Sequence, residues 1–286
     1  MRRVAIVGTG LMGASVGLAL KAADFDGEVL GWDANPAELA AARELGAIDH
    51  TIPSREAVLE CGAELYLLAT PVLPILDWMQ RLAPALGEGQ LVTDVGSTKR
   101  EISTLAARVY NGAGQAAFLP GHPMAGKESG GAALAEATLF RGATWLFTPV
   151  GETESALVTE WRAWVERIGA TPRDMEPEAH DEVCAWVSHL PQMVSTALAA
   201  LLEETFAEDA ELLAAVQTIG GRALRETTRL GASPYSMWRD VALTNTEPIA
   251  ASLHALEQRL AHLRENLRTP ELREEFVLAN RFRAKQ

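Results

Sequence analysis

The histidine in the glycine-rich segment GHPMAG is well suited to acid–base chemistry. His122 lies in this segment, Gly121 to Gly126, directly after the apolar run Ala116 to Leu119. An imidazole can accept and return a proton near neutral pH because its ordinary pKa lies there. The segment DVGSTK, Asp94 to Lys99, follows another apolar run and contributes Ser97. We expect both segments to be loops at strand ends that border one site, since open α/β sheets bind ligands beyond the carboxyl ends of their strands.

A dinucleotide-binding motif opens the chain. RVAIV, Arg3 to Val7, predicts a buried strand, GTGLMG follows it, and Ala14 to Leu20 continues as an apolar helix. The three glycines of such a turn allow a tight bend, a close approach of backbone to pyrophosphate, and close packing of helix on strand. The residues of the turn that we expect at the cofactor are Gly8, Gly10, Leu11, Met12 and Gly13.

The second predicted strand ends in an acidic residue that indicates the choice of cofactor. This strand, Glu28 to Trp32, is followed by Asp33, at about the twenty-residue spacing of the dinucleotide motif. A carboxylate there can accept a hydrogen bond from a ribose 2′-hydroxyl and would repel a 2′-phosphate, which favours NAD over NADP. A turn residue before the next asparagine and proline is the alternative for Asp33. We expect Thr70 and Pro71, after the strand Leu65 to Ala69, at the same cofactor site.

Alternating strands and helices predict an α/β fold with a doubly wound, mainly parallel Rossmann-type sheet. We expect a helix from about Glu154 to Ile168 and a domain boundary close to Glu176. Residues 1–176 would form the dinucleotide-binding domain, and residues 177–286 an all-helical domain for substrate binding and dimerisation. The other predicted strands are Gln90 to Thr93, Ala116 to Leu119, Ala143 to Thr148 and Pro172 to Met175.

A long helix with an internal proline is predicted from Asp181 to Leu202, where apolar residues recur at helical spacing. Pro191 leaves the Val187 carbonyl without its helical partner and should kink this helix. A second face carries polar residues that either face a site or bond to another helix. These residues are Asp181, His189, Gln192 and Thr196.

A leucine seam near the end of the chain predicts packing of one helix against another. Its steps alternate between three and four residues, as in a coiled coil. The partner could be another helix of the same chain, but we favour a homodimer interface because the helical domain is short. The seam comprises Leu253, Leu256, Leu260, Leu263 and Leu267.

Composition excludes several classes of function. The 286 residues carry a net charge of −13, from 38 acidic and 25 basic residues, which argues against binding to nucleic acid or to anionic membranes. No apolar run reaches the length of about 20 residues that spans a bilayer, and we expect a cytoplasmic protein. Four arginines cluster in this acidic chain and either solvate helix surfaces or collect an anionic ligand. They are Arg222, Arg225, Arg229 and Arg239.

The two cysteines predict neither a disulfide nor a metal site. Cys61 and Cys184 lie far apart in the sequence and outside any C-x-x-C pattern. We expect two reduced, buried thiols and no bound metal.

Five motifs, in order along nearly the whole chain, resemble those of the prephenate dehydrogenase family of tyrosine biosynthesis. The resemblance implies an oxidoreductase in which a cyclohexadienol loses hydride from C4 to NAD while its C1 carboxylate leaves as carbon dioxide. The motifs are GTGLMG, DVGSTK, GHPMAGKES at Gly121 to Ser129, SHLPQMVSTAL at Ser188 to Leu198, and TRLGASPYSMWRD at Thr228 to Asp240.

The resemblance also implies roles for individual residues. His122 matches the family's catalytic base, and Ser97 matches a serine that bonds to the histidine or the substrate hydroxyl. A simple cap on the following helix is the alternative for Ser97. Arg229 matches the arginine that binds the substrate carboxylate, and a guanidinium suits a carboxylate because it offers a planar fork of donors. His189 matches a second family histidine, for which we favour an orienting or helix-bridging role over proton transfer. Positions bordering or gating the family's site are matched by Glu128, Trp238, His180 and Asp181.

One departure from the family pattern leaves the substrate open. Gln192 stands where many prephenate-using members carry the second histidine of SHLPH. Prephenate has a keto acid side chain, whereas arogenate carries an ammonium and a carboxylate, and we favour prephenate with arogenate as the alternative. We expect no regulatory domain of the kind appended in some relatives, and we therefore expect any tyrosine inhibition to be competitive.

Two other functions were weighed against this one. A β-hydroxyacid dehydrogenase also joins a dinucleotide domain to a helical one, but its acid or base is a lysine, and Lys285 is the only lysine beyond Lys127. A protein that senses NAD without turnover would need the glycine turn and Asp33 but neither His122 nor Arg229.

Overall fold

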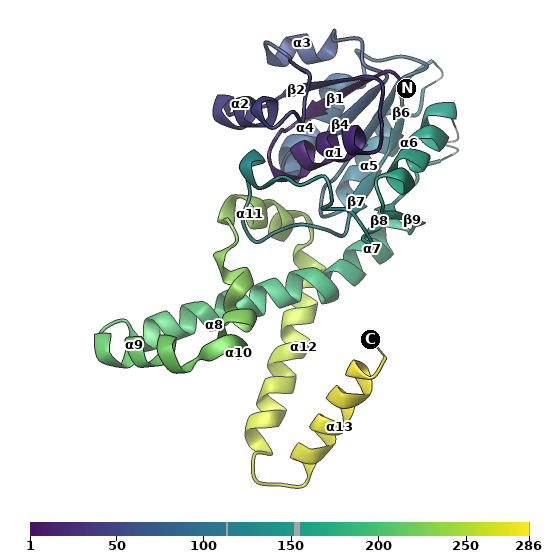
Figure 1. The fold of residues 1–286 in the computed structure, drawn as a ribbon. Helices are drawn as coiled ribbons and strands as arrows, with labels where there is room; N and C mark the ends of the chain where they lie inside the picture. The colour runs from purple at the N-terminus through teal and green to yellow at the C-terminus, as the bar shows by residue number, and fades with distance from the viewer. Residues whose placement is uncertain (113, 152–154, 286) are drawn as a thin grey trace.

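A parallel sheet covered by helices forms the N-terminal half of the molecule (Figure 1). The structure is a computed structural model that describes residues 1–112, 114–151 and 155–285. Within those ranges the sheet has six strands in the order β3-β2-β1-β4-β5-β6, which confirms the predicted α/β class. The strands are β1 Arg3–Val7, β2 Glu28–Trp32, β3 His50–Thr51, β4 Leu65–Leu68, β5 Leu91–Asp94 and β6 Ala117–Leu119. Its helices are α1 Leu11–Ala22, α2 Pro36–Glu44, α3 Arg55–Leu59, α4 Val72–Leu82 and α5 Arg100–Val109.

Strand β1 explains why this sheet is buried on both faces. Its alternate residues Val4 and Ile6 belong to one hydrophobic core, and Ala5 and Val7 belong to another. Successive side chains of a strand point to opposite faces, so an uninterrupted apolar strand needs cover on both sides. The predicted bounds of β1 and β2 are confirmed residue for residue.

A second, three-stranded sheet corrects the prediction for the segment around His122. Strand β7 (Gly121–Pro123) pairs antiparallel with β8 (Thr144–Phe147), and β8 pairs parallel with β9 (Thr171–Asp174). His122 therefore lies within a strand and not on a loop. The runs predicted at 143–148 and 172–175 are strands, but they join this sheet instead of extending the parallel one. Helix α6 (Ala156–Arg167) covers it, and its predicted start at Glu154 lies outside the described residues.

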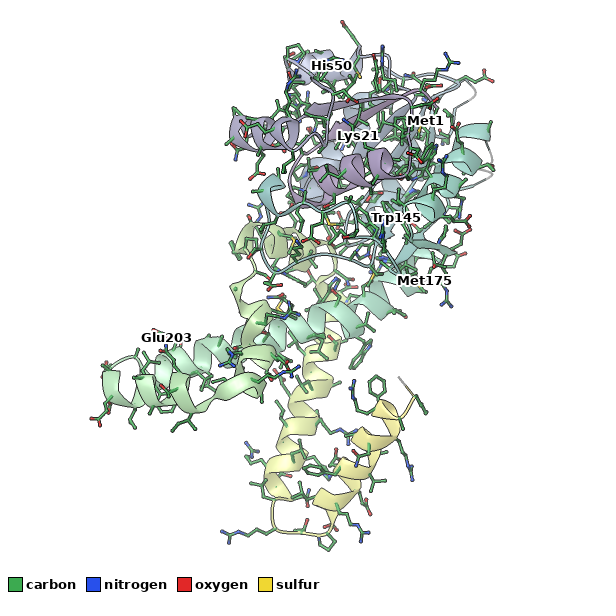
Figure 2. The ribbon with its side chains drawn as sticks, viewed as in Figure 1. Met1, Lys21, His50, Trp145, Met175 and Glu203 are labelled. Carbon is green, nitrogen blue, oxygen red and sulfur yellow. The ribbon has the colours of Figure 1, made fainter. Side chains whose placement is uncertain are left out.

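All elements described beyond Glu176 are helical. Figure 2 labels Met175, where the chain leaves β9 for this part of the molecule. None of the described helices is long and apolar enough to cross a membrane. The helices are α7 Pro177–Cys184, α8 Leu190–Phe206, α9 Ala210–Ile219, α10 Gly221–Thr228, α11 Tyr235–Thr244, α12 Thr246–Glu265 and α13 Glu271–Arg283.

A π-helical turn, Ala185–His189, joins α7 to α8 just before Pro191. The predicted break therefore takes the form of a widened turn. In a regular α-helix, residues nine apart such as His180 and His189 lie on opposite sides, at about 100° per residue. The wider turn changes that phase, and both histidines are buried.

Two groups of helices extend away from the sheet as separate arms (Figure 1). One arm continues α8 into α9 and α10, and the other consists of α12 and the returning α13. Parts of the leucine seam are uncovered within this chain, since Leu260 is 55% and Leu267 is 64% exposed. Leu267 lies just beyond the end of α12.

Two carboxylates from the helical part cap helices of the sheet domain. Asp181 accepts hydrogen bonds from the backbone N–H groups of Lys99 at 2.7 Å and Arg100 at 2.9 Å, where α5 begins. Asp240 accepts one from the N–H of Leu73 in the first turn of α4, at 3.1 Å. An N-terminal cap stabilises a helix by about 1 kcal/mol, and here it also joins the two parts of the molecule.

Candidate functional site

An interdomain cleft of about 610 Å³ lies between the carboxyl ends of the parallel strands and the helices of the second half. This volume is within the range of about 300–1,000 Å³ typical of ligand sites. The cleft brings together residues that are more than two hundred positions apart in the sequence. Predicted site residues that line it are Leu11, Met12, Thr70, Pro71, Ser97, His122, Glu128, Gln192, Arg229 and Trp238.

The glycine turn beside this cleft has the geometry that a dinucleotide needs. Gly8 has a φ of 95°, and a Cβ at Gly13 would lie 1.9 Å from the carbonyl oxygen of Gly8. A Cβ at Gly10 would meet no described atom within 4 Å, which leaves room for a ligand. Helix α1 begins there with no side chain of the described residues capping it, so its first amides can bind a phosphate.

Asp33 lies at the carboxyl end of β2 and holds the glycine turn. Its carboxylate accepts hydrogen bonds from the N–H of Thr9 at 2.7 Å and the N–H of Asn35 at 2.8 Å. Asn35 in turn caps α2. The turn role proposed as an alternative for Asp33 is therefore present in the structure.

His122 is buried at the cleft and is bonded to a second histidine. Its Nδ1 lies 2.9 Å from Nε2 of His180, and the Nδ1 of His180 lies 2.8 Å from Oδ1 of Asp181. His122 comes from β7, whereas His180 and Asp181 are neighbours on α7. Three side chains from two parts of the molecule thus form one hydrogen-bonded row that ends at the cleft.

The surroundings of this row favour neutral imidazoles. Burial, followed by the charges of His180, Lys99 and His189, holds the pKa of His122 well below its usual 6.5. Burial also lowers the pKa of His180, although the Asp181 carboxylate acts in the opposite direction. Burial raises the pKa of Asp181, but the His180 ring and the amides of α5 outweigh it and keep that pKa below 3.8. Neutral histidines beside an ionised carboxylate are the outcome.

A buried ion pair supports the start of β7. Lys99 donates to Asp94, and both side chains are fully buried. Asp94 also accepts from the N–H of Gly96 at 2.8 Å and from that of Gly121 at 3.1 Å. These contacts fix the residue next to His122.

Ser97 lines the cleft and does not cap the following helix. The residue at the cap position of α5 is Lys99, and the capping acceptor is Asp181 from α7. The capping alternative for Ser97 is therefore wrong, and its half-buried hydroxyl stays available at the cleft.

His189 does not line the cleft with the other residues expected to bind substrate, and its contacts are those of a residue that bridges helices. It is buried, its Nδ1 lies 3.1 Å from the side-chain amide of Asn245, and its ring meets Trp238 edge-on at 5.8 Å between centroids. Burial lowers the pKa of His189 to about 4. Its Nε2 has no partner among the described residues. Only Trp238 of this pair reaches the cleft.

Of the four clustered arginines, Arg229 alone lines the cleft within the part of the chain that the structure describes. It donates to the Glu128 carboxylate at 2.7 Å, and its side chain is 53% exposed. Such a half-exposed pair contributes at most about 1 kcal/mol, so an anionic ligand can compete for the guanidinium. Arg222 and Arg239 instead pair with acids near them in sequence, Glu226 and Asp240.

Gln192 has its hydrogen-bonding groups occupied. Its amide nitrogen donates to the carbonyl of Leu230 at 2.6 Å and to the hydroxyl of Thr196 at 3.1 Å, and its oxygen accepts from Ser233 at 3.2 Å. This buried side chain joins α8 to the turn that carries Arg229. Gln192 also lines the cleft. The polar face of this helix therefore both bonds to another segment and faces the site.

Cys184 lies beside the two histidines, which its position in the sequence did not indicate. Its Sγ is 3.6 Å from Nε2 of His180, and the donor atoms of His122, His180 and Cys184 lie within 4.8 Å of one another. Burial raises the pKa of the Cys184 thiol to about 12, and metals bind the thiolate. The hydrogen-bonded row accounts for both histidines without a metal.

Several residues of the site were not predicted from the sequence. Asp94, Lys99, Asp240 and Asn245 are polar and nine-tenths or more buried, and each bonds across elements. Asp94 and Lys99 are the first and last residues of the segment DVGSTK and Asp240 ends TRLGASPYSMWRD, so their place in these motifs was the available signal, although it did not reveal their contacts. Asn245 lies outside every motif.

Comparisons with known proteins cover almost the whole chain. Two family models match, the nucleotide-binding domain of prephenate dehydrogenase over residues 16–172 and its dimerization domain over residues 176–280. A prephenate dehydrogenase of Bacillus subtilis is 33% identical over 247 residues, which is 86% of this chain and 65% of that protein. The chain thus spans slightly less than two thirds of this relative's length.

Two solved structures resemble the fold closely. Prephenate dehydrogenase from Aquifex aeolicus, in complex with hydroxyphenyl propionate and NAD+, has a TM-score of 0.89 at 30% identity, covering 100% of this chain and 98% of that one. Arogenate dehydrogenase from Synechocystis has a TM-score of 0.76 at 29% identity, covering 99% of both chains.

Proposed function

Because the chain belongs to the prephenate dehydrogenase family, we propose that it catalyses the NAD-dependent oxidative decarboxylation of prephenate to 4-hydroxyphenylpyruvate. The observation that carries this proposal is the buried, neutral His122 in the same cleft as Arg229 and beside the glycine turn. The reaction requires a proton acceptor, an anion-binding group and a dinucleotide site.

His122 is the proposed general base. A neutral imidazole can take the proton from the C4 hydroxyl as hydride leaves that carbon, and the released carboxylate departs as carbon dioxide. Ser97, in the same cleft, is proposed to hydrogen-bond the substrate hydroxyl or His122. General base catalysis contributes roughly 10² to 10⁴ in rate.

NAD is the proposed cofactor, and the residues present fit it. When bound, it supplies the acceptor for the hydride. Gly8, Gly10, Gly13 and the first amides of α1 would hold its pyrophosphate, and Asp33 would accept from its ribose. Leu11, Met12, Thr70 and Pro71 line the adjoining part of the cleft.

Arg229 is the proposed partner of a substrate carboxylate. One nitrogen of its guanidinium, Nη1, already donates to the Glu128 carboxylate, and a substrate carboxylate would take over this position. Trp238 and Gln192 also line this end of the cleft, and the ring of His189, which lies outside the cleft, packs edge-on against Trp238.

Arogenate is the second candidate substrate, and Glu128 is the observation that favours it. A carboxylate freed from Arg229 could receive the ammonium of arogenate. Gln192 is neutral and fully bonded, so it adds no charge that would select between the two acids. The Synechocystis neighbour shows that the fold accommodates enzymes named for arogenate.

The wider setting is also a proposal. We place the division of the chain at residues 1–176 and 177–286, with a homodimer formed through the helical part, where the arms leave Leu260 and Leu267 uncovered. A cytoplasmic location, and competition by tyrosine for the substrate site, complete this proposal.

A panel of two substrates and two cofactors tests the function. Prephenate and arogenate are each mixed with the protein and with NAD or NADP, and the absorbance of reduced cofactor is followed. Turnover of prephenate with NAD above all other combinations is the expected result. No reduction in any of the four mixtures would refute the proposed activity and favour a protein that binds NAD without turnover.

A further inference from the structure

The row formed by Asp181, His180 and His122 determines which nitrogen of His122 carries a proton. All three side chains are at least nine-tenths buried, so water does not compete for their hydrogen bonds. The two links measure 2.8 Å and 2.9 Å, both within hydrogen-bond range. Each link needs a single hydrogen between its two heavy atoms.

The proton positions follow from the carboxylate. Ionised Asp181 is only an acceptor, so Nδ1 of His180 must carry the hydrogen between them. A neutral His180 then has a lone pair on Nε2, and the hydrogen of the second link must belong to Nδ1 of His122. The remaining nitrogen of His122, Nε2, is left with a free lone pair.

The groups around the row act on the protonation of His180 in both directions, and the net effect is a lowered pKa, because burial and Lys99 outweigh the carboxylates of Asp181 and Asp94. A protonated His180 would donate to His122 and force the hydrogen of His122 onto Nε2, the nitrogen needed as a base. Burial and the nearby Lys99 oppose that protonation. The titratable groups that face the row are Lys99 of the α5 start, Asp94 of β5, Cys184 of α7 and His189 of the π-helical turn.

Asp181 is itself held firmly. Its Oδ1 accepts from the N–H of Lys99 and faces Nδ1 of His180, and its Oδ2 accepts from the N–H of Arg100. The start of helix α5 therefore orients the carboxylate toward His180. The backbone carbonyl of the same residue accepts from Asn245 at 2.8 Å. A carboxylate fixed from both parts of the molecule can orient an imidazole without moving.

We propose that Asp181 and His180 are positioning residues that hold His122 in the tautomer with hydrogen on Nδ1, so that Nε2 receives the C4 hydroxyl proton. This inference deepens the proposed function and rests on it. In the reaction the hydroxyl O–H bond would break and its proton would join Nε2, while hydride would leave C4 for bound NAD. The C1–carboxylate bond would break, its electron pair would enter the ring, and carbon dioxide would leave. The proton on Nε2 would then return to the phenolate oxygen, so that the product carries a hydroxyl and His122 is neutral again. The Nδ1 hydrogen stays in its bond to His180, and Asp181 is not protonated.

Nitrogen NMR of the intact protein labelled with ¹⁵N-histidine tests the tautomer directly. The chain has six histidines, and the spectra of His122→Asn and His180→Asn identify the two signals of interest. We expect a protonated Nδ1 and an unprotonated Nε2 on His122 at neutral pH. A proton on Nε2 of His122 would overturn the proposal.

Asp181→Asn tests the consequence for the reaction. The carboxylate accepts three hydrogen bonds, whereas the amide has one acceptor oxygen and no charge, so it cannot keep all three. The hydrogen between this side chain and His180 is then no longer held on Nδ1 by an anion, and the hydrogen of His122 can move to Nε2. We expect that signal to move and kcat to fall by about 10² to 10⁴, with KM and the affinity for NAD unchanged. Glu182→Gln, the same charge change at the exposed next residue of α7, is the control and should match the wild type.

The possible outcomes separate this inference from the function. An unchanged tautomer and kcat in Asp181→Asn would overturn the positioning role. If Asp181→Asn does not fold, the wild-type tautomer still decides. A wild-type protein with hydrogen on Nδ1 of His122 that turns over neither prephenate nor arogenate would refute the proposed function and leave the row's effect on the tautomer standing.

Discussion

Mild acid should destabilise this protein through His189, because the folded chain cannot protonate that residue at the pH where the unfolded chain does. Burial lowers the pKa of His189 from 6.5 to about 4. Between these values the unfolded state binds one more proton than the folded state. Stability is therefore lost as the pH falls through the window from about 6.5 to about 4.

The size of the effect follows from the width of that window. Lowering the pH from about 7 to about 5 should reduce the free energy of unfolding by about 2 kcal/mol through His189 alone. The pKa values of His122 and His180 are also lowered, so both add to the loss with the same sign. Against a typical total of about 5–15 kcal/mol, this change is large.

Urea unfolding followed by tryptophan fluorescence at a series of pH values measures the effect. The variant His189→Asn removes one titrating group, so its free energy of unfolding should change less with pH than that of the wild type. His254→Asn, which removes an imidazole that is 70% exposed, is the matched control. Equal free energies of unfolding at the two ends of the window would refute the reasoning.

Substitutions in the glycine turn and at Arg229 test the cofactor and substrate parts of the site. Gly13→Ala places a Cβ 1.9 Å from the Gly8 carbonyl oxygen and should abolish NAD binding in a fluorescence titration. Gly10→Ala has open space around it and should keep the stability of the wild type but lose affinity for NAD. Normal NAD binding by Gly13→Ala would contradict the packing argument. Arg229→Ala should raise KM roughly ten- to a hundredfold through the loss of about 1.5–3 kcal/mol of charge-assisted bonding, while the exposed Arg225→Ala should not; an unchanged KM would return Arg229 to the class of surface arginines.

The sequence was sufficient for the parallel sheet and its glycine turn because their signals are local. The run RVAIV, followed at once by Gly8 and Gly13, already contains the buried strand and the close helix packing that the structure confirms. The second sheet was not predictable in the same way. Strand β7 has three residues and pairs with β8 across a long loop, so no periodicity marks it.

The site residues that could be predicted are those whose side-chain chemistry and motif together indicate a role. His122 and Arg229 were expected at a common site, and the structure places both at the cleft. The partners of His122 depend on tertiary contacts, because Asp181 of α7 caps a helix that starts at Lys99. Pro191 signalled a break in its helix, but not the π-helical turn that buries His189 away from the cleft.

Hydride transfer in His122→Asn tests the central claim most directly. The variant is mixed rapidly with NAD and prephenate, and the absorbance of reduced cofactor gives the rate, with the affinity for NAD measured separately. The account predicts a rate about 10² to 10⁴ below that of the wild type with NAD binding intact. A rate close to that of the wild type would contradict it.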